Sequence, residues 1–192
     1  MSLPRLLAAS IASAALAACA TLAPPGEPAR RAAAFDLVGR VAATYEGRAF
    51  TSGVRWEHLP ERDEIWLLTP MGQALAHITA DASGATLTGA DQNQYHAGDV
   101  ERLTQRALGW ALPLAQLTWW VRGELAPGVP ADEALRDQRG RLVRLRQDGW
   151  HIVYVHPADD GRSGRPQRLD LARAGQQIRL VIDNWRDSAA AP

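Results

Sequence analysis

The sequence contains one cysteine, no lysine and no apolar run long enough to cross a bilayer as a helix, which needs about 20 residues. A lone cysteine, Cys19, excludes an intramolecular disulfide and a cysteine-based metal cluster. Its 21 basic residues, all arginine, are balanced by 21 acidic residues, and the basic patch that nucleic-acid binding requires is missing. These absences favour a class of protein that handles neither nucleic acid nor a sulfur-bound metal.

The N-terminus reads as a targeting segment. Arg5 precedes an apolar run over residues 6–18, which predicts a signal peptide at 1–18. This run ends in Leu16–Cys19, which resembles the bacterial lipobox, where cleavage precedes the cysteine and lipid is attached to it. The alternative is a chance cysteine beside an alanine-rich cleavage site. Because Ala20, rather than aspartate, follows Cys19, the bacterial sorting rule favours the outer membrane.

The rest of the chain divides into a tether, a domain and a short tail. Residues 19–34 are rich in proline and alanine without an amphipathic period, so we expect a lipidated tether. Its ends would lie about 20 Å apart as a coil and roughly 50 Å apart when extended. Residues 35–187 have the length of one domain, and residues 188–192 are predicted to be a disordered tail.

A hairpin stands out between residues 65 and 78, where two apolar runs flank Pro70, Met71 and Gly72. Proline presets the first corner of a turn, and glycine adopts the left-handed conformation that closes it. Met71 is then placed at the tip, where turns usually carry a polar residue. A single exposed apolar side chain is common on protein surfaces, so this turn alone does not establish a function.

The remaining pattern predicts a mainly β (α+β) fold, an antiparallel sheet with a helical insertion. Asp99 and Gly109 can begin and end one helix, and a second follows Pro113. Asp148-Gly149 is a strong hairpin signal. The expected strands cover residues 35–44, 54–57, 65–78, 85–87, 94–96, 143–147, 150–154, 168–172 and 178–185. A curved sheet with a cavity and a tightly packed core both fit this pattern.

Signals for catalysis are weak. The five histidines form no metal-binding pair, and a nucleophile elbow and a phosphate-binding glycine loop are both missing. Asp159-Asp160 suggests a carboxylate pair, but a solvated loop explains it as well. We therefore expect no enzyme activity, no metal and no cofactor.

A series of short motifs, taken in order, resembles the LolB family of outer-membrane lipoprotein receptors. The resemblance covers about residues 35–186 together with the lipobox. Each motif alone is weak, but their order and spacing are specific. They are Phe35–Val41, Val54–Trp56, Leu67–Gln73, Leu112–Leu114, Trp120–Gly123, Gln147–Trp150, Val153–Tyr154 and Arg179–Trp185.

That resemblance implies an open antiparallel β-half-barrel covered by helices, enclosing an apolar cavity. It implies a lipid-anchored, periplasm-facing receptor that accepts acylated lipoproteins from the carrier LolA and inserts them into the outer membrane. The loop bearing Met71 would protrude and work in membrane delivery. The family usually has leucine at this tip, and methionine is comparably apolar. We expect a monomer with outer-membrane lipid as a further partner.

Strand alternation and the apolar stripe of the second helix nominate eight residues for the cavity lining. A register error of one residue would move a strand's candidates to the other face. Two other functions remain open: an envelope lipoprotein that binds lipid or protein as a structural accessory, and an enzyme with a dispersed site. The candidates are Trp56, Leu67, Ile78, Leu117, Trp120, Ile152, Tyr154 and Leu180.

Overall fold

The computed structural model describes residues 31–158 and 164–186. The predicted signal peptide at 1–18, the lipidation site Cys19, the tether as far as residue 30 and the tail at 188–192 lie outside the described residues. The described chain forms a single antiparallel sheet of eleven strands in the order β6-β5-β4-β3-β2-β1-β11-β10-β9-β8-β7. The sheet is open because β6 and β7 each leave one edge unpaired.

The first six strands precede both helices, and the last five follow them. The early strands are β1 (Phe35–Tyr45), β2 (Arg48–Leu59), β3 (Arg62–Leu68), β4 (Ala74–Asp81), β5 (Gly84–Gly89) and β6 (Gln94–Ala97). The helices are α1 (Val100–Leu108) and α2 (Leu114–Trp120). The late strands are β7 (Ala131–Arg136), β8 (Leu142–Gln147), β9 (Trp150–Val155), β10 (Arg168–Arg173) and β11 (Gln176–Arg186).

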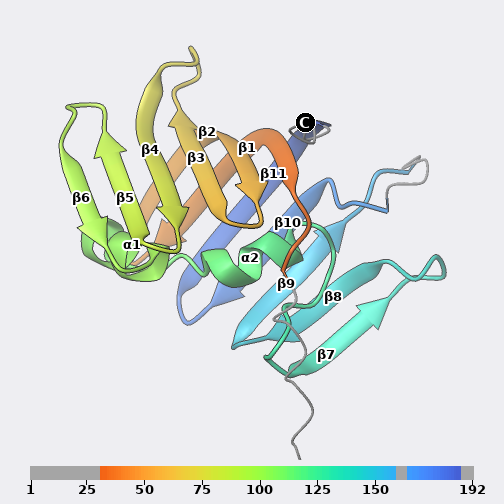
Figure 1. Cartoon of the computed structure of the whole chain (residues 1–192). Coiled ribbons are helices and arrows are strands. Elements are labelled where there is room, and N and C mark those ends of the chain that lie inside the picture. Colours follow the sequence, from red (N-terminus) through yellow and green to blue (C-terminus); the bar gives the residue numbers. More distant parts are fainter. Residues whose placement is uncertain (1–30, 159–163, 187–192) are drawn as a thin grey trace, which may run out of the picture. The chain divides into compact units, whose positions relative to one another are not determined.

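Both helices lie against one face of the curved sheet (Figure 1). Helix α1 contacts β5 and β6, and α2 contributes Leu117 and Trp120 to the main core. The strands contribute alternate residues to that core, such as Ile152 and Tyr154 of β9. Neither helix in the described ranges is long and apolar enough to span a membrane. The architecture is the open antiparallel half-barrel that the family resemblance implied.

The turn and cap signals of the sequence have the expected geometry. The Asp99 carboxylate accepts the backbone N–H of Arg102 at 2.7 Å, and Gly109 ends α1 with φ of 86°. Asp148 and Gly149 both have positive φ, as a tight hairpin turn requires. Helix α2 begins one residue after Pro113, which is its N-cap and not part of its first turn.

Two strands differ from the prediction. Strand β2 begins at Arg48, six residues before the predicted start, and pairs with β1 from Arg48 to His58. Strand β7 was not predicted, because Ala131–Arg136 contains three charged residues and little alternation. The first four residues of β2 and most of β7 are exposed, so burial imposes little pattern on these two stretches of sequence.

The fully buried Gln147 ties the segment after α2 to the sheet. Its carbonyl oxygen accepts the Trp120 indole N–H at 2.8 Å and the Ala126 backbone N–H at 3.0 Å. Its amide donates to the backbone oxygens of Ala126 and Val129. Three of the four bonds are buried and that to Val129 is partly buried, in surroundings where an unpaired polar group is costly. Gln147 therefore fixes α2 over the concave face.

Gly39 lies in β1 at a position that has no room for a side chain. It lies where the register between β1 and β11 shifts, and a Cβ added there would stand 2.1 Å from the Val181 carbonyl oxygen. Gly39→Ala should therefore force the two strands apart and lower the free energy of unfolding by about 2 kcal/mol. Urea unfolding checks this value. Gly98→Ala is the control, because only a flexible arginine side chain lies within 4 Å; equal losses would contradict the explanation.

Candidate functional site

An apolar hollow of about 650 Å³ lies between the sheet and α1. Strands β1 to β6 and the C-terminal part of α1, with Trp110 just after it, supply its walls. Its lining is mostly aliphatic and aromatic and contains no carboxylate. The lining residues are Ala43, Tyr45, Arg48, Ala49, Phe50, Leu67, Leu75, Ala76, Ile78, Leu87, Gly89, Tyr95, Arg106, Ala107 and Trp110.

Large apolar side chains reach solvent at the rim of the hollow. Phe50, Leu75 and Tyr95 are 43%, 36% and 53% exposed, although all three line it. The inner wall is closed by Ile78 and Leu87, which are buried. The arrangement suits an elongated apolar ligand, because it can enter past an apolar rim and lose its contact with water inside.

The loop between β3 and β4 carries the most exposed large apolar side chain of the described residues, Met71, at 88%. Thr69 closes the loop: its N–H donates to the Gln73 carbonyl at 2.8 Å, and its carbonyl accepts the Gly72 N–H at 2.9 Å. Gly72 has φ of 81°, the left-handed conformation expected from the sequence. Leu75, four residues after Met71, belongs to the rim of the hollow. The start of β4 therefore connects the tip of the loop to the rim.

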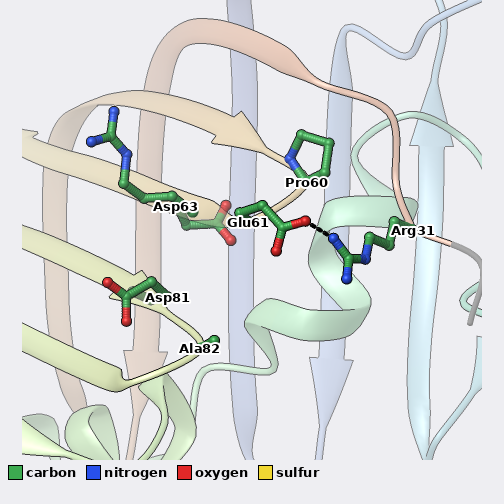
Figure 2. Close-up of a pocket in the computed structure, with 8 residues that line it drawn as sticks. Arg31, Pro60, Glu61, Asp63, Asp81 and Ala82 are labelled. Atoms are coloured by element: carbon green, nitrogen blue, oxygen red, sulfur yellow. Dashed lines mark ion pairs between the residues drawn. The ribbon is translucent and has the colours of Figure 1, made fainter.

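A second hollow, of about 290 Å³, lies at the opposite end of β3 and has a different chemistry (Figure 2). Its walls carry charged residues from the segment before β1, the β2–β3 turn and the ends of β3 and β4. They include Asp81 and an ion pair between Arg31 and Glu61. Nearby, Asp63 accepts the Trp56 indole N–H at 2.6 Å and lies 2.8 Å from a ring nitrogen of His58. This polar site suits no acyl chain.

The eight residues nominated from the sequence fall into two groups. Leu67 and Ile78 line the apolar hollow. The other six are buried in the main core and are not part of its lining: Trp56, Leu117, Trp120, Ile152, Tyr154 and Leu180. Their assignment to an acyl-binding cavity stays a prediction. All eight side chains belong to the main core or pack against it.

Sequence reasoning missed the rim. Phe50 and Leu75 lie near the ends of their strands, and Tyr95 lies in a strand of only four residues. Alternation cannot mark such positions as inward-facing when their neighbours are exposed on both faces. The available signal was the presence of large apolar residues at strand ends and in a very short strand.

Two tyrosines, one in the hollow and one in the core, have a raised hydroxyl pKa for different reasons. Tyr45 lines the hollow, and its hydrogen bond with the Glu46 carboxylate raises the pKa of its hydroxyl. Tyr154 lies in the core, where burial raises the pKa of its hydroxyl despite a lowering effect of Arg136. Both phenols therefore stay neutral at physiological pH. Charge in the lining of the hollow is confined to Arg48 and Arg106.

Within the described part of the chain, no three or more histidine, cysteine, aspartate or glutamate side chains are grouped so that they could hold a metal ion. The histidines at 58 and 77 instead lie close to carboxylates of β3, within 2.8 Å and 3.5 Å. The carboxylates therefore serve strand-to-strand contacts.

Comparison with known families agrees with this geometry. Residues 33–185 match the family described as "Outer membrane lipoprotein LolB". The chain belongs to the LolB family. Its relatives include proteins named outer-membrane lipoprotein LolB from three bacteria. The one from Nitrosomonas europaea is 40% identical over 79% of this chain and 72% of its own. The protein from Chromobacterium violaceum is 39% identical over 83% of this chain and 86% of its own. The protein from Thiobacillus denitrificans is 40% identical over 91% of this chain and 93% of its own.

Solved structures also align with the chain, at low sequence identity. A LolA superfamily protein from Nitrosomonas europaea aligns with a TM-score of 0.46 and 12% identity, covering 81% of this chain and 86% of that protein. A putative outer-membrane lipoprotein-sorting protein domain from Vibrio parahaemolyticus aligns with a TM-score of 0.48 and 8% identity, covering 83% of this chain and 87% of that domain.

Proposed function

We propose that this protein is an outer-membrane lipoprotein receptor of the Lol pathway. It takes acylated lipoproteins from a LolA-like periplasmic carrier, holds their acyl chains in the apolar hollow and inserts them into the inner leaflet of the outer membrane. The observation that carries the proposal is the hollow with an exposed apolar rim in a chain of the LolB family. The protein acts from the outer membrane, facing the periplasm on its own lipid anchor at Cys19.

The energetics of acyl chains explain why such a receptor needs a hollow. Each CH₂ group exposed to water costs about 0.8 kcal/mol, so a lipoprotein cannot cross the periplasm with bare chains. The lining contains neither a nucleotide-binding motif nor a cluster of ionisable groups that would drive the step. Cargo must therefore move down a gradient of affinity, from carrier to receptor to bilayer.

The partners follow from the same scheme. They are a LolA-like carrier, the acylated cargo and the lipid of the outer membrane, and the receptor acts as a monomer without catalysing a reaction. The partly open hollow supports transfer through its rim, where Phe50 and Tyr95 offer apolar contact to a donor's cargo. The alternative, an envelope lipoprotein that binds lipid or protein as a structural accessory, would be favoured by a closed apolar core without a hollow.

Blocking the hollow tests the proposal. Ala76 lines it and is half-buried, so Ala76→Trp should fill part of the space and weaken binding of an acylated peptide by about tenfold or more. Quenching of tryptophan fluorescence by brominated acyl chains measures the affinity. Ala134→Trp, on the exposed part of β7, is the matched control and should bind as the wild type does. Unchanged affinity in folded Ala76→Trp would reject the hollow as the binding site.

A further inference from the structure

The two edges of the sheet differ in how they are protected. The β7 edge carries charge at Asp132, Glu133 and Arg136. The β6 edge has none: residues 92–97 read Gln-Asn-Gln-Tyr-His-Ala. Charged side chains normally guard an open edge against pairing with another chain, and β6 lacks this guard. Its only protection is its length of four residues.

The register of β6 shows which of its backbone groups are available. Gly89 donates its N–H to the Asn93 carbonyl at 2.9 Å, which makes this a hydrogen-bonded pair. Antiparallel pairs alternate between bonded and non-bonded, so Tyr95 and Ala97 also bond to β5. Gln94 and His96 fall between them, and their N–H and C=O groups point away from β5.

The same strand borders the hollow. Tyr95 extends from β6 into the lining and is 53% exposed, while His96 lies on the other face, 2.9 Å from the Thr86 hydroxyl. Helix α1 contacts both β5 and β6, and β6 is the terminal strand of the sheet, paired with β5 alone. An open, uncharged strand edge therefore lies directly beside the apolar hollow.

We propose that the β6 edge binds the peptide segment that follows the acylated first residue of the cargo, as a short twelfth strand. The inference rests on the proposed function: if acyl chains fill the hollow, the residue that carries them is held at the rim, and the next residues must pass over it. The backbone groups of Gln94 and His96 then pair with the peptide whatever its sequence, because main-chain bonds need no particular side chain.

The shortness of β6 suits a transfer step. Two outward-facing residues provide at most two N–H donors and two C=O acceptors. Because so few hydrogen bonds form, the pairing adds only modestly to the affinity for the acyl chains. The peptide is therefore released readily when the acyl chains leave for the bilayer. It also discriminates between a lipoprotein and a free lipid, because only the lipoprotein has a peptide to pair.

Two synthetic probes test the inference. One is diacylglyceryl-cysteine amide, and the other is the same lipid-bearing cysteine followed by eight uncharged residues. The extended probe should bind about fivefold more tightly to the wild type and should slow amide hydrogen exchange at Gln94 and His96, measured by NMR. The short probe should bind without protecting either amide.

Variants separate the backbone from the side chain. Gln94→Pro removes an outward N–H at the first residue of β6, where proline is tolerated, and should abolish the advantage of the extended probe. Gln94→Thr keeps the backbone N–H and should preserve the tighter binding of the extended probe. Asp132→Pro at the β7 edge, where the register shifts, is the control and should also preserve it.

The outcomes distinguish the two proposals. Equal binding of both probes, with the amides of Gln94 and His96 unprotected, would overturn the edge-strand inference and leave the receptor function standing. Failure of both probes to bind would overturn both proposals. Protection appearing at β7 instead of β6 would also refute the inference.

Discussion

Met71→Glu is expected to fold and accept cargo normally but to insert cargo into liposomes about 100-fold more slowly than the wild type. Met71 is 88% exposed at a turn fixed by the bonds of Thr69, so its replacement should change stability by about 0.5 kcal/mol or less. A carboxylate resists entry into the acyl region of a bilayer by about 3 kcal/mol, which corresponds to the expected factor.

Met71→Leu is the matched variant and should be nearly silent, because leucine keeps the apolar surface. Thermal unfolding, transfer from a loaded carrier and incorporation into liposomes are measured for both variants. Normal incorporation by Met71→Glu would refute a membrane role for this loop. Loss of cargo acceptance with the fold intact would instead place Met71 in the donor interface or at the mouth of the hollow, whose rim residue Leu75 follows four residues later.

Cys19→Ala should release the protein from the membrane while leaving the domain folded. The lipobox-like segment and the single cysteine motivate this prediction, and Cys19 lies outside the described residues, so it rests on sequence. Each buried acyl CH₂ contributes about 0.8 kcal/mol, so removing the attachment site removes the entire anchoring energy. Membrane fractionation and mass spectrometry of the mature protein check the result.

A conservative comparison for that variant is Ala20→Ser, which alters the neighbouring residue without touching the thiol. It should remain acylated and in the membrane fraction. Mature Cys19→Ala protein that lacks an acyl mass and yet stays firmly in the membrane would contradict the lipid-anchor assignment. Near-identical thermal unfolding of the released and anchored forms is expected, because residues 35–186 form their own core.

Local chemistry made much of this fold predictable. Asp99 supplies a cap that needs only a short polar side chain, and Gly109 and Gly149 supply positive φ that other residues adopt at a cost. The hairpin that bears Met71 follows from the same rule at Gly72. Such signals depend on a few neighbouring residues, so a single sequence is sufficient to locate them.

The limits of the hollow could not be predicted in the same way. Strand alternation placed Trp56 and Ile152 in the interior, and the apolar stripe of the second helix placed Trp120 there; all three are buried. Neither signal tells which part of the concave face is filled by α2 and which part stays open. That division depends on where Gln147 fixes the segment after α2. Long-range packing of this kind leaves no period in the sequence.

A transfer assay tests the central claim most directly. A LolA-like carrier is loaded with a fluorescent lipoprotein and mixed with this domain, and the location of the cargo is followed by size-exclusion chromatography. The receptor function predicts that most of the cargo moves to the domain without added nucleotide, and that Ala76→Trp reduces this transfer whereas Ala134→Trp does not. Cargo that stays entirely on the carrier in the presence of folded wild-type domain would contradict the account.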